Sequence, residues 1–163
     1  MTEGLRASSR DRAQELVEQY AKEHGARWLS EDVVERRKYW FFPVGYIGSI
    51  GVFVDKATGA LTSAGSAYDL ETWSWGYERG LLAEPTNLTV TNISDAHNTL
   101  ELLLHVLGAG PARLPNPNPK RRWLRDQLGR LPATFPDENL TLRIPSFREA
   151  VENGWFEFEA KEG

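Results

Sequence analysis

The stretch YWFFPVGYIGSIGVFVDKATGALTSAGSAYDLETWSWGYERGLL, residues 39–82, decides the fold class of this chain. It opens with four consecutive aromatic residues, Tyr39 to Phe42, which predict a strand that is covered on both faces or that offers one face to a partner. Pro43 is expected to limit how far this strand continues, because proline cannot donate a hydrogen bond to the ladder. A second apolar run, Ile50 to Val54, predicts the neighbouring strand.

The turn at residues 55–59, DKATG, predicts a hairpin, because Gly59 can adopt the positive φ that such turns favour. The chain then returns as a third strand over Leu61 to Ala64. Strands joined in this way indicate an antiparallel sheet.

A helix rich in aromatic residues follows this sheet. Its apolar positions recur at three- and four-residue intervals, the spacing of one helical face: Leu70, Trp73, Tyr77 and Leu81. Asp69 or Ser66 can cap its first turn, and Gly80 keeps it short. Trp75 falls off the inner stripe, so it is either an exposed contact residue or packs in a second layer.

Further helices and strands are predicted on either side of this stretch. An N-terminal helix carries an apolar stripe over 13–21, with Ser8 or Ser9 as its cap and Gly25 at its end. The elements expected downstream are a strand over 88–91, a helix over 95–107, a basic helix over 121–131 with Trp123, Leu124, Leu128 and Leu131 inward, a strand over 140–144, a short helix capped by Ser146 and Glu149, and a final strand over 155–159.

These elements predict an α+β fold, in which an N-terminal helix and further helices pack on an antiparallel sheet and the C-terminal strand docks through Trp155, Phe156 and Phe158. The Pro-rich segment 111–120 separates a core, residues 1–110, from a helix–strand extension, residues 121–163, which we expect to pack on the same core. Within that segment, Pro115 to Pro119 predict a polyproline-like spacer.

Composition and charge exclude several classes of protein. The 163 residues are 40% hydrophobic and 26% charged, which suits one ordinary domain with its own core. Cysteine is absent, so disulfides, thiolate metal sites and cysteine nucleophiles are excluded. The net charge of −4 argues against a general nucleic-acid binder. Residues 1–19 lack the apolar core of a signal peptide, and no run suits a membrane span, so we expect a cytoplasmic protein.

The sequence contains no recognised catalytic or metal-binding pattern. His97 and His105 lie about two helical turns apart, which is too far to share a metal ion. His97 could form an acid–base pair with Asp95, although a solvated histidine at a helix start is the simpler interpretation. The glycines of residues 44–51 recur every third position without the lysine of a phosphate-binding loop, so they indicate a glycine-rich connection between strands. We therefore expect no enzymatic activity, cofactor or metal.

Two groups of charged residues are candidate surfaces. The basic group of the post-spacer helix contains Lys120, Arg121, Arg122, Arg125 and Arg130. It can meet phosphate or an acidic partner, or it is a solvated helix face. Acidic residues gather near the C-terminus, at Glu149, Glu152, Glu157, Glu159 and Glu162, and along the first helix, at Asp11, Glu15, Glu18 and Glu23. An acidic face can enter a nuclease or deaminase groove by imitating nucleic acid, or it serves solubility alone.

Residues 10–83 resemble the YrhB-like immunity domains (immunity protein 35 type) of bacterial polymorphic-toxin systems. The resemblance rests on four segments: Ala13, Glu15, Leu16, Val17 and Tyr20; Trp40, Phe41 and Phe42; Val54, Asp55, Lys56, Thr58 and Gly59; and Gly65, Ser66 and Ala67. It implies an antidote that binds a cognate toxin and blocks it, with no catalytic residues to carry over. One relative in this family behaves as a chaperone.

The resemblance and the surface residues together predict an immunity protein that occludes the active site of a secreted bacterial toxin domain. We expect aromatic anchors with a charged rim, and the predicted contacts are Trp73, Trp75, Tyr77, Glu78, Glu157 and Glu159. The partner is thus a protein, with no direct contact to nucleic acid or membrane. Two alternatives stay open: a chaperone or adaptor that binds clients through exposed aromatic surface, and a small enzyme that uses a carboxylate or His97.

Overall fold

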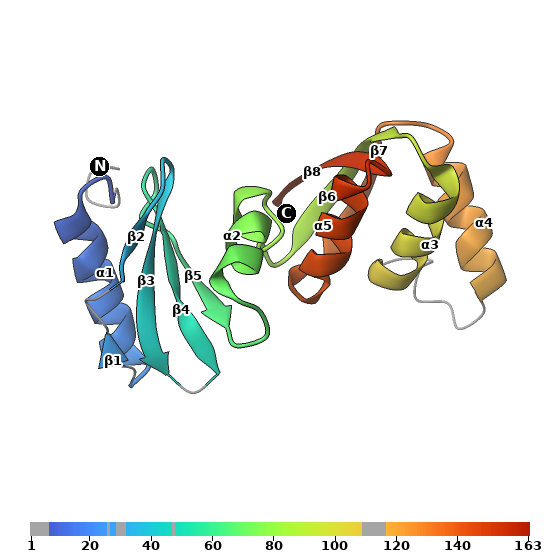
Figure 1. Cartoon of the computed structure of the whole chain (residues 1–163). Coiled ribbons are helices and arrows are strands. Elements are labelled where there is room, and N and C mark those ends of the chain that lie inside the picture. The colour runs from blue at the N-terminus through green and yellow to red at the C-terminus, as the bar shows by residue number, and fades with distance from the viewer. Residues whose placement is uncertain (1–6, 26, 29–31, 47, 109–116) are drawn as a thin grey trace. The chain divides into compact units, whose positions relative to one another are not determined.

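A computed structural model describes residues 7–25, 27–28, 32–46, 48–108 and 117–163 (Figure 1). The chain divides into two compact units, Met1–Leu70 and Glu71–Gly163, and each unit is described by itself below. Both units combine helix with antiparallel strands, so the predicted α+β class is confirmed. Within the described residues the strands form two sheets, one in each unit, where the sequence predicts one.

In the first unit, a helix packs on an antiparallel sheet (Figure 1). Helix α1 (Arg10–Glu23) begins where the Ser9 side chain accepts a hydrogen bond from the Arg12 backbone N–H at 3.2 Å, as predicted. The strands are β1 (Arg27–Trp28), β2 (Val34–Glu35), β3 (Tyr39–Tyr46), β4 (Ser49–Asp55) and β5 (Leu61–Gly65). They lie in the order β1-β3-β4-β5, and β2 also pairs with β3.

The core of the first unit lies between α1 and the sheet. Its buried members are Ala7, Ala13, Val17, Trp40, Phe42, Val44, Val52 and Val54. The indole Nε1 of Trp40 donates a hydrogen bond to the Ala7 carbonyl at 2.9 Å, which satisfies a buried donor. Tyr39 and Phe41 alternate to the other face of β3 and are also buried. The aromatic strand is therefore covered on both faces, which confirms one of the two interpretations of its sequence.

Strand β3 continues past Pro43, contrary to the sequence prediction. Its register with β4 shifts between Pro43 and Tyr46, and an irregularity of this kind lets a strand accommodate a proline. Opposite Pro43 stands Gly51, where a Cβ atom would lie 2.4 Å from Cζ of Phe41 and 2.5 Å from the carbonyl oxygen of Phe42. The glycine-rich segment thus allows a closely packed connection between strands, as predicted.

The turn between β4 and β5 is closed by Asp55. Its Oδ1 atom accepts hydrogen bonds from the backbone N–H groups of Ala57 and Thr58, both at 2.9 Å. Gly59 adopts a φ of 74°, as the sequence predicts. Asp55 and Gly59 are thus residues that this turn requires, one as a hydrogen-bond acceptor and the other for its positive φ.

The second unit is built around β6 (Thr86–Ile93). This strand pairs antiparallel with β7 (Ala133–Glu138) on one side and with β8 (Phe156–Glu162) on the other. The sequence analysis predicts strands in the place of β6 and β8 and makes no prediction for the residues of β7. β7 is an edge strand, and its register shifts where Pro136 lies, which is a setting that tolerates proline.

Helices cover one face of this sheet (Figure 1). They are α2 (Leu70–Glu78), α3 (Ala96–Val106), α4 (Pro117–Leu128), the short 3₁₀ helix η3 (Thr141–Arg143) and α5 (Ile144–Glu152). Trp123 of α4 contacts Phe135 of β7, with ring centres 5.8 Å apart. Phe147 of α5 contacts Phe156 and Phe158 of β8, with ring centres 6.1 and 5.2 Å away. The predicted docking of the C-terminal strand through its aromatic residues is observed for these two rings.

The predicted strand over 140–144 is wrong. Leu140 precedes η3, which covers Thr141–Arg143, and Ile144 is the first residue of α5. Asn139 favours the turn, because its Oδ1 atom accepts hydrogen bonds from the backbone N–H and the hydroxyl of Thr141, at 3.4 and 2.9 Å. Pro145 then stands in the first turn of α5, where proline is favoured.

Two predicted helix ends also differ. Helix α5 begins at Ile144, so Ser146 lies inside the helix and the predicted capping box with Glu149 does not form its start. Helix α4 ends at Leu128, and Leu131 is 38% exposed rather than directed inward. Leu124, by contrast, is fully buried, as predicted.

The chain divides into units at Leu70 and Glu71, whereas the sequence places a connection at 111–120. β6 precedes that segment, β7 and β8 follow it, and all three strands share one sheet, which holds both parts in one unit. Helix α4 already begins at Pro117, because the first turn of a helix accepts proline, so the end of the predicted polyproline-like spacer is helical. Pro115 lies outside the described residues.

We predict that Phe147→Ala strongly destabilises the chain, because the ring is fully buried and contacts two rings of β8. Truncations of this kind cost about 3–5 kcal/mol. The control is Leu142→Ala, since Leu142 is 69% exposed and its truncation should change the free energy of unfolding by less than about 0.5 kcal/mol. Chemical denaturation measures both, and similar values for the two variants would contradict the assigned core.

Candidate protein-binding surfaces

The sheet of the second unit leaves one polar face uncovered by its helices. Successive strand residues point to opposite faces, so the residues between the inward apolar positions gather on this face. We call it the acidic sheet face, and its members are Asn87, Thr89, Asn92, Thr134, Glu157, Glu159 and Lys161. Thr89 opposes Glu159 in the register, and Asn92 opposes Glu157.

The two glutamates of this face are available to a partner. Glu157 and Glu159 are exposed, and neither forms an ion pair with any residue that the structure describes. Beside them on the same face, the hydroxyls of Thr89 and Thr134 lie 3.0 Å apart, within hydrogen-bond distance. The arrangement is a polar sheet surface with two free carboxylates on the edge strand β8.

The aromatic residues of α2 are less accessible than their sequence suggests. Trp73 is only 5% exposed, so it offers little surface to a partner and does not suit the contact role predicted for it. Trp75 is half-buried, and the guanidinium of Arg79 lies 4.1 Å from its ring centre. Arg79 also donates to the Trp75 carbonyl at 3.0 Å and lies 3.9 Å from a carboxylate oxygen of Glu78. Tyr77 is half-buried.

The six predicted contact residues do not form one patch. Helix α2 packs closely on α5, where a Cβ atom at Gly76 would lie 2.6 Å from Cδ1 of Ile144. An ion pair of 2.8 Å between Arg148 and Glu71 joins the same two helices. Because α5 covers the sheet face opposite to Glu157 and Glu159, those two glutamates are separated from the residues of α2.

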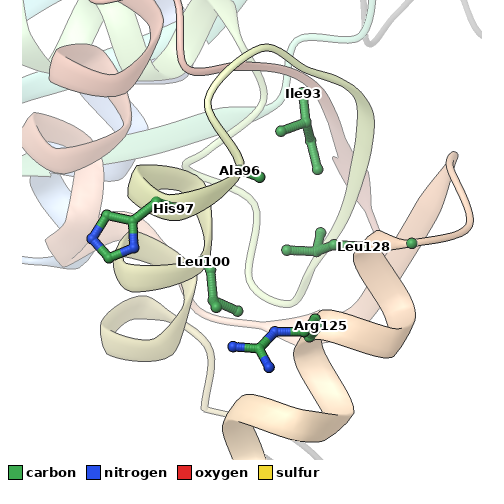
Figure 2. Close-up of a pocket in the computed structure, with 7 residues that line it drawn as sticks. Ile93, Ala96, His97, Leu100, Arg125 and Leu128 are labelled. Carbon is green, nitrogen blue, oxygen red and sulfur yellow. The ribbon is translucent and has the colours of Figure 1, made fainter.

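A second surface, which the sequence does not predict as a groove, lies between α3 and α4. A pocket of about 430 Å³ is lined by Ile93, Ala96, His97, Leu100, Arg125, Leu128 and Gly129. Figure 2 shows the side chains of Ile93, Leu100 and Leu128 directed into the same gap from three elements. The guanidinium of Arg125 extends from α4 toward Leu100 of α3 (Figure 2).

The basic residues of α4 fall into two groups. Lys120 and Arg121 are engaged within the unit: Lys120 donates to the carbonyls of Leu104 and Leu107 at the end of α3, and Arg121 pairs with Glu101. Burial lowers the pKa of Lys120, and the ion pair lowers the pKa of Glu101. The remaining members of the predicted basic group, Arg122, Arg125 and Arg130, are exposed and have no carboxylate partner within the described residues.

The structure gives Asp95 a structural role, as the cap of a helix, rather than a hydrogen bond to the His97 ring. Asp95 caps α3: its Oδ1 accepts from the Asn98 backbone N–H at 3.0 Å and its Oδ2 from the Asn98 side chain at 2.8 Å. These hydrogen bonds lower the pKa of Asp95, since they favour the carboxylate form. His97 is exposed, and its ring is turned away from Arg125 (Figure 2). Among the described residues, no group of three or more acidic or histidine side chains is placed to hold a metal ion.

Comparison of the chain with models of known protein families, with curated proteins and with solved structures finds no match. In the part of the chain that the structure describes, every helix is too short or too polar to cross a membrane.

We predict that the Asp95 cap makes stability depend on acidity. Because its pKa in the folded chain lies below the ordinary value of 3.8, the cap stabilises α3 above that value and the gain is lost as the pH falls through the lowered pKa. Asp95→Asn keeps an oxygen acceptor without the charge, so the difference in unfolding temperature between the two proteins should shrink in acid. Asp126→Asn, at an exposed site, is the control. A difference that stays constant with pH would refute the assignment.

Proposed function

We propose that this chain is an immunity protein, which binds one toxin domain and occludes its active site through the acidic sheet face. The observation that carries the proposal is the pair of exposed carboxylates of Glu157 and Glu159. They have no ion-pair partner among the described residues and lie on one face of the sheet. Free carboxylates of this kind complement a cationic groove, and they accelerate and orient association with it.

The acidic sheet face suits toxins whose active sites bind anions. Nucleases, deaminases that act on nucleic acid and ADP-ribosyltransferases all bind phosphate-bearing substrates, so their clefts carry positive charge. Glu157 and Glu159 are two residues apart on one strand, so both carboxylates are directed to the same side. A pair placed in this way can occupy the position of successive phosphates and exclude the substrate.

The resemblance to the YrhB-like immunity domains supports the class of function rather than the contact surface. The matching residues lie in the first unit, and several have structural roles there. Val17, Trp40 and Val54 belong to the core, and Asp55 closes the β-turn. In our proposal the partner is recognised by residues outside the matching segment, namely those of the acidic sheet face.

The alternative of a chaperone or adaptor requires exposed apolar surface, and α2 offers limited surface of this kind because Trp73 is buried and Trp75 and Tyr77 are half-buried. Leu142, at 69%, is the most exposed large apolar side chain among the described residues. The enzyme alternative requires turnover that depends on His97 or a carboxylate. Both alternatives are separated from the proposal by the experiment below.

The proposal predicts that Glu157→Lys together with Glu159→Lys abolishes protection. The chain would be tagged in its native host, its stoichiometric partner identified, and that partner expressed as a toxin in a susceptible strain with and without the chain. The native chain should restore growth against this toxin and against no unrelated toxin. The double variant should lose protection and bind the toxin at least about a hundredfold more weakly, because two like-charge contacts replace two attractive ones.

The control is Glu149→Lys, which makes at an exposed site on α5 the charge change that each of the two substitutions makes. It should retain protection. Loss of protection in both variants would show that net charge matters rather than the acidic sheet face. Suppression of aggregation for many unrelated proteins would favour the chaperone, and catalytic turnover lost on His97→Ala would favour the enzyme.

A further inference from the structure

The groove between α3 and α4 is larger than the pocket of Figure 2 alone. A second pocket of about 570 Å³ adjoins the first, since Arg125 and Gly129 line both. Its lining is polar and consists of Arg125, Asp126, Gln127, Gly129, Arg130, Pro132, Ala133 and Thr134. Taken together, the two adjoining pockets are a groove lined by residues of α3, of α4 and of the start of β7. We call it the arginine groove.

One half of the arginine groove is apolar. Ile93 at the end of β6, Leu100 on α3 and Leu128 on α4 converge there (Figure 2). Leu100 is 7% exposed and forms the floor, while Ile93 and Leu128 are half-buried and form the walls. When a further apolar group covers these side chains, apolar surface is removed from water, and this lowers the free energy of the complex.

The other half of the groove is cationic. Arg125 and Arg130 are exposed and have no carboxylate partner among the described residues, and Arg122 lies one helical turn before Arg125. Asp126 also lines this half and offsets one of these charges. The groove thus keeps a local positive charge on a chain whose net charge is −4.

We infer that the arginine groove binds an acidic amphipathic segment of a partner polypeptide. Apolar side chains of that segment would lie over Leu100 and Leu128, and a carboxylate would pair with Arg125 where the two halves meet. Helical segments of partner proteins dock in grooves in this way, through apolar anchors at helical spacing. The arginine groove adjoins the acidic sheet face, since Thr134 belongs to both, but Arg125, Leu100 and Leu128 lie outside that face. The inference does not rest on the function proposed above.

The composition of the groove favours a polypeptide over a nucleic acid. Its floor is aliphatic, whereas single-stranded nucleic acids are bound by aromatic side chains on which bases stack. The negative net charge of the chain also opposes the approach of a polyanion, whereas a short segment with a few carboxylates meets only the local arginines. An extended groove of two adjoining pockets suits a segment of several residues.

The test uses the full chain and a fluorescent synthetic peptide with leucines at helical spacing and glutamates elsewhere. A second peptide carries glutamine in place of each glutamate. We expect the glutamate peptide to bind at least about tenfold more tightly at low salt, and that advantage to fall at high salt. Arg125→Glu should remove the advantage, whereas Arg143→Glu, an exposed arginine on η3, should keep it. Amide chemical shifts should change at Ile93, Leu100 and Leu128.

Several results would overturn the inference. These are equal binding of the two peptides, unchanged binding by Arg125→Glu, or shift changes confined to other parts of the chain. An oligonucleotide that binds the same residues more tightly than the glutamate peptide would identify a nucleic-acid site instead. Octanoate that shifts the groove residues in a chain that binds neither peptide would identify a site for small apolar anions.

Discussion

The second unit depends on the pairing of β6 with strands that lie far from it in the sequence. Helices α3 and α4 separate β6 from β7 in the chain, and η3 and α5 separate β7 from β8, yet β7 and β8 each pair along one edge of β6. Leu88 and Val90 of this strand are fully buried, so the central strand supplies both the ladder and the middle of the core. Because a strand presents alternate residues to opposite faces, the register of β8 places Phe156 and Phe158 under α5 and Glu157 and Glu159 on the opposite face. One pairing thus determines both the core and the acidic sheet face.

The sequence predicts those parts of the fold whose conformation depends on interactions between residues close together in the chain. The Ser9 cap, the Asp55 turn and the alternation of β8 are all of this kind, since each depends on residues a few positions apart. The sequence misses β7 because Pro136 is compatible with a strand only at an edge and at a register shift, and both conditions are set by the distant strand β6. The predicted strand over 140–144 fails for the opposite reason, because the Asn139 turn outweighs the apolar residues around it.

The binding surfaces could be predicted only in part. Helical spacing identifies the stripe of α2, but spacing does not determine how deeply Trp73 is buried. The alternating aromatic and acidic residues of β8 predict that Glu157 and Glu159 share the face opposite to Phe156 and Phe158, because successive strand residues point to opposite faces. The arginine groove could not be found in this way, since its apolar residues come from β6, α3 and α4, and only the fold brings them beside Arg125.

Some charged residues of the second unit form hydrogen bonds inside the fold, and others are exposed to solvent. Lys120 holds the end of α3, and the buried Glu138 accepts a hydrogen bond from the Gly108 backbone N–H at 2.9 Å, so both satisfy groups that folding removes from water. Solvent-exposed charges, by contrast, contribute little to stability even when they are paired. Arg125, Glu157 and Glu159 are exposed and form no ion pair within the described residues, so they contribute little to the stability of the unit. They lie on two surfaces of opposite charge, the arginine groove and the acidic sheet face, which the two proposed interactions use.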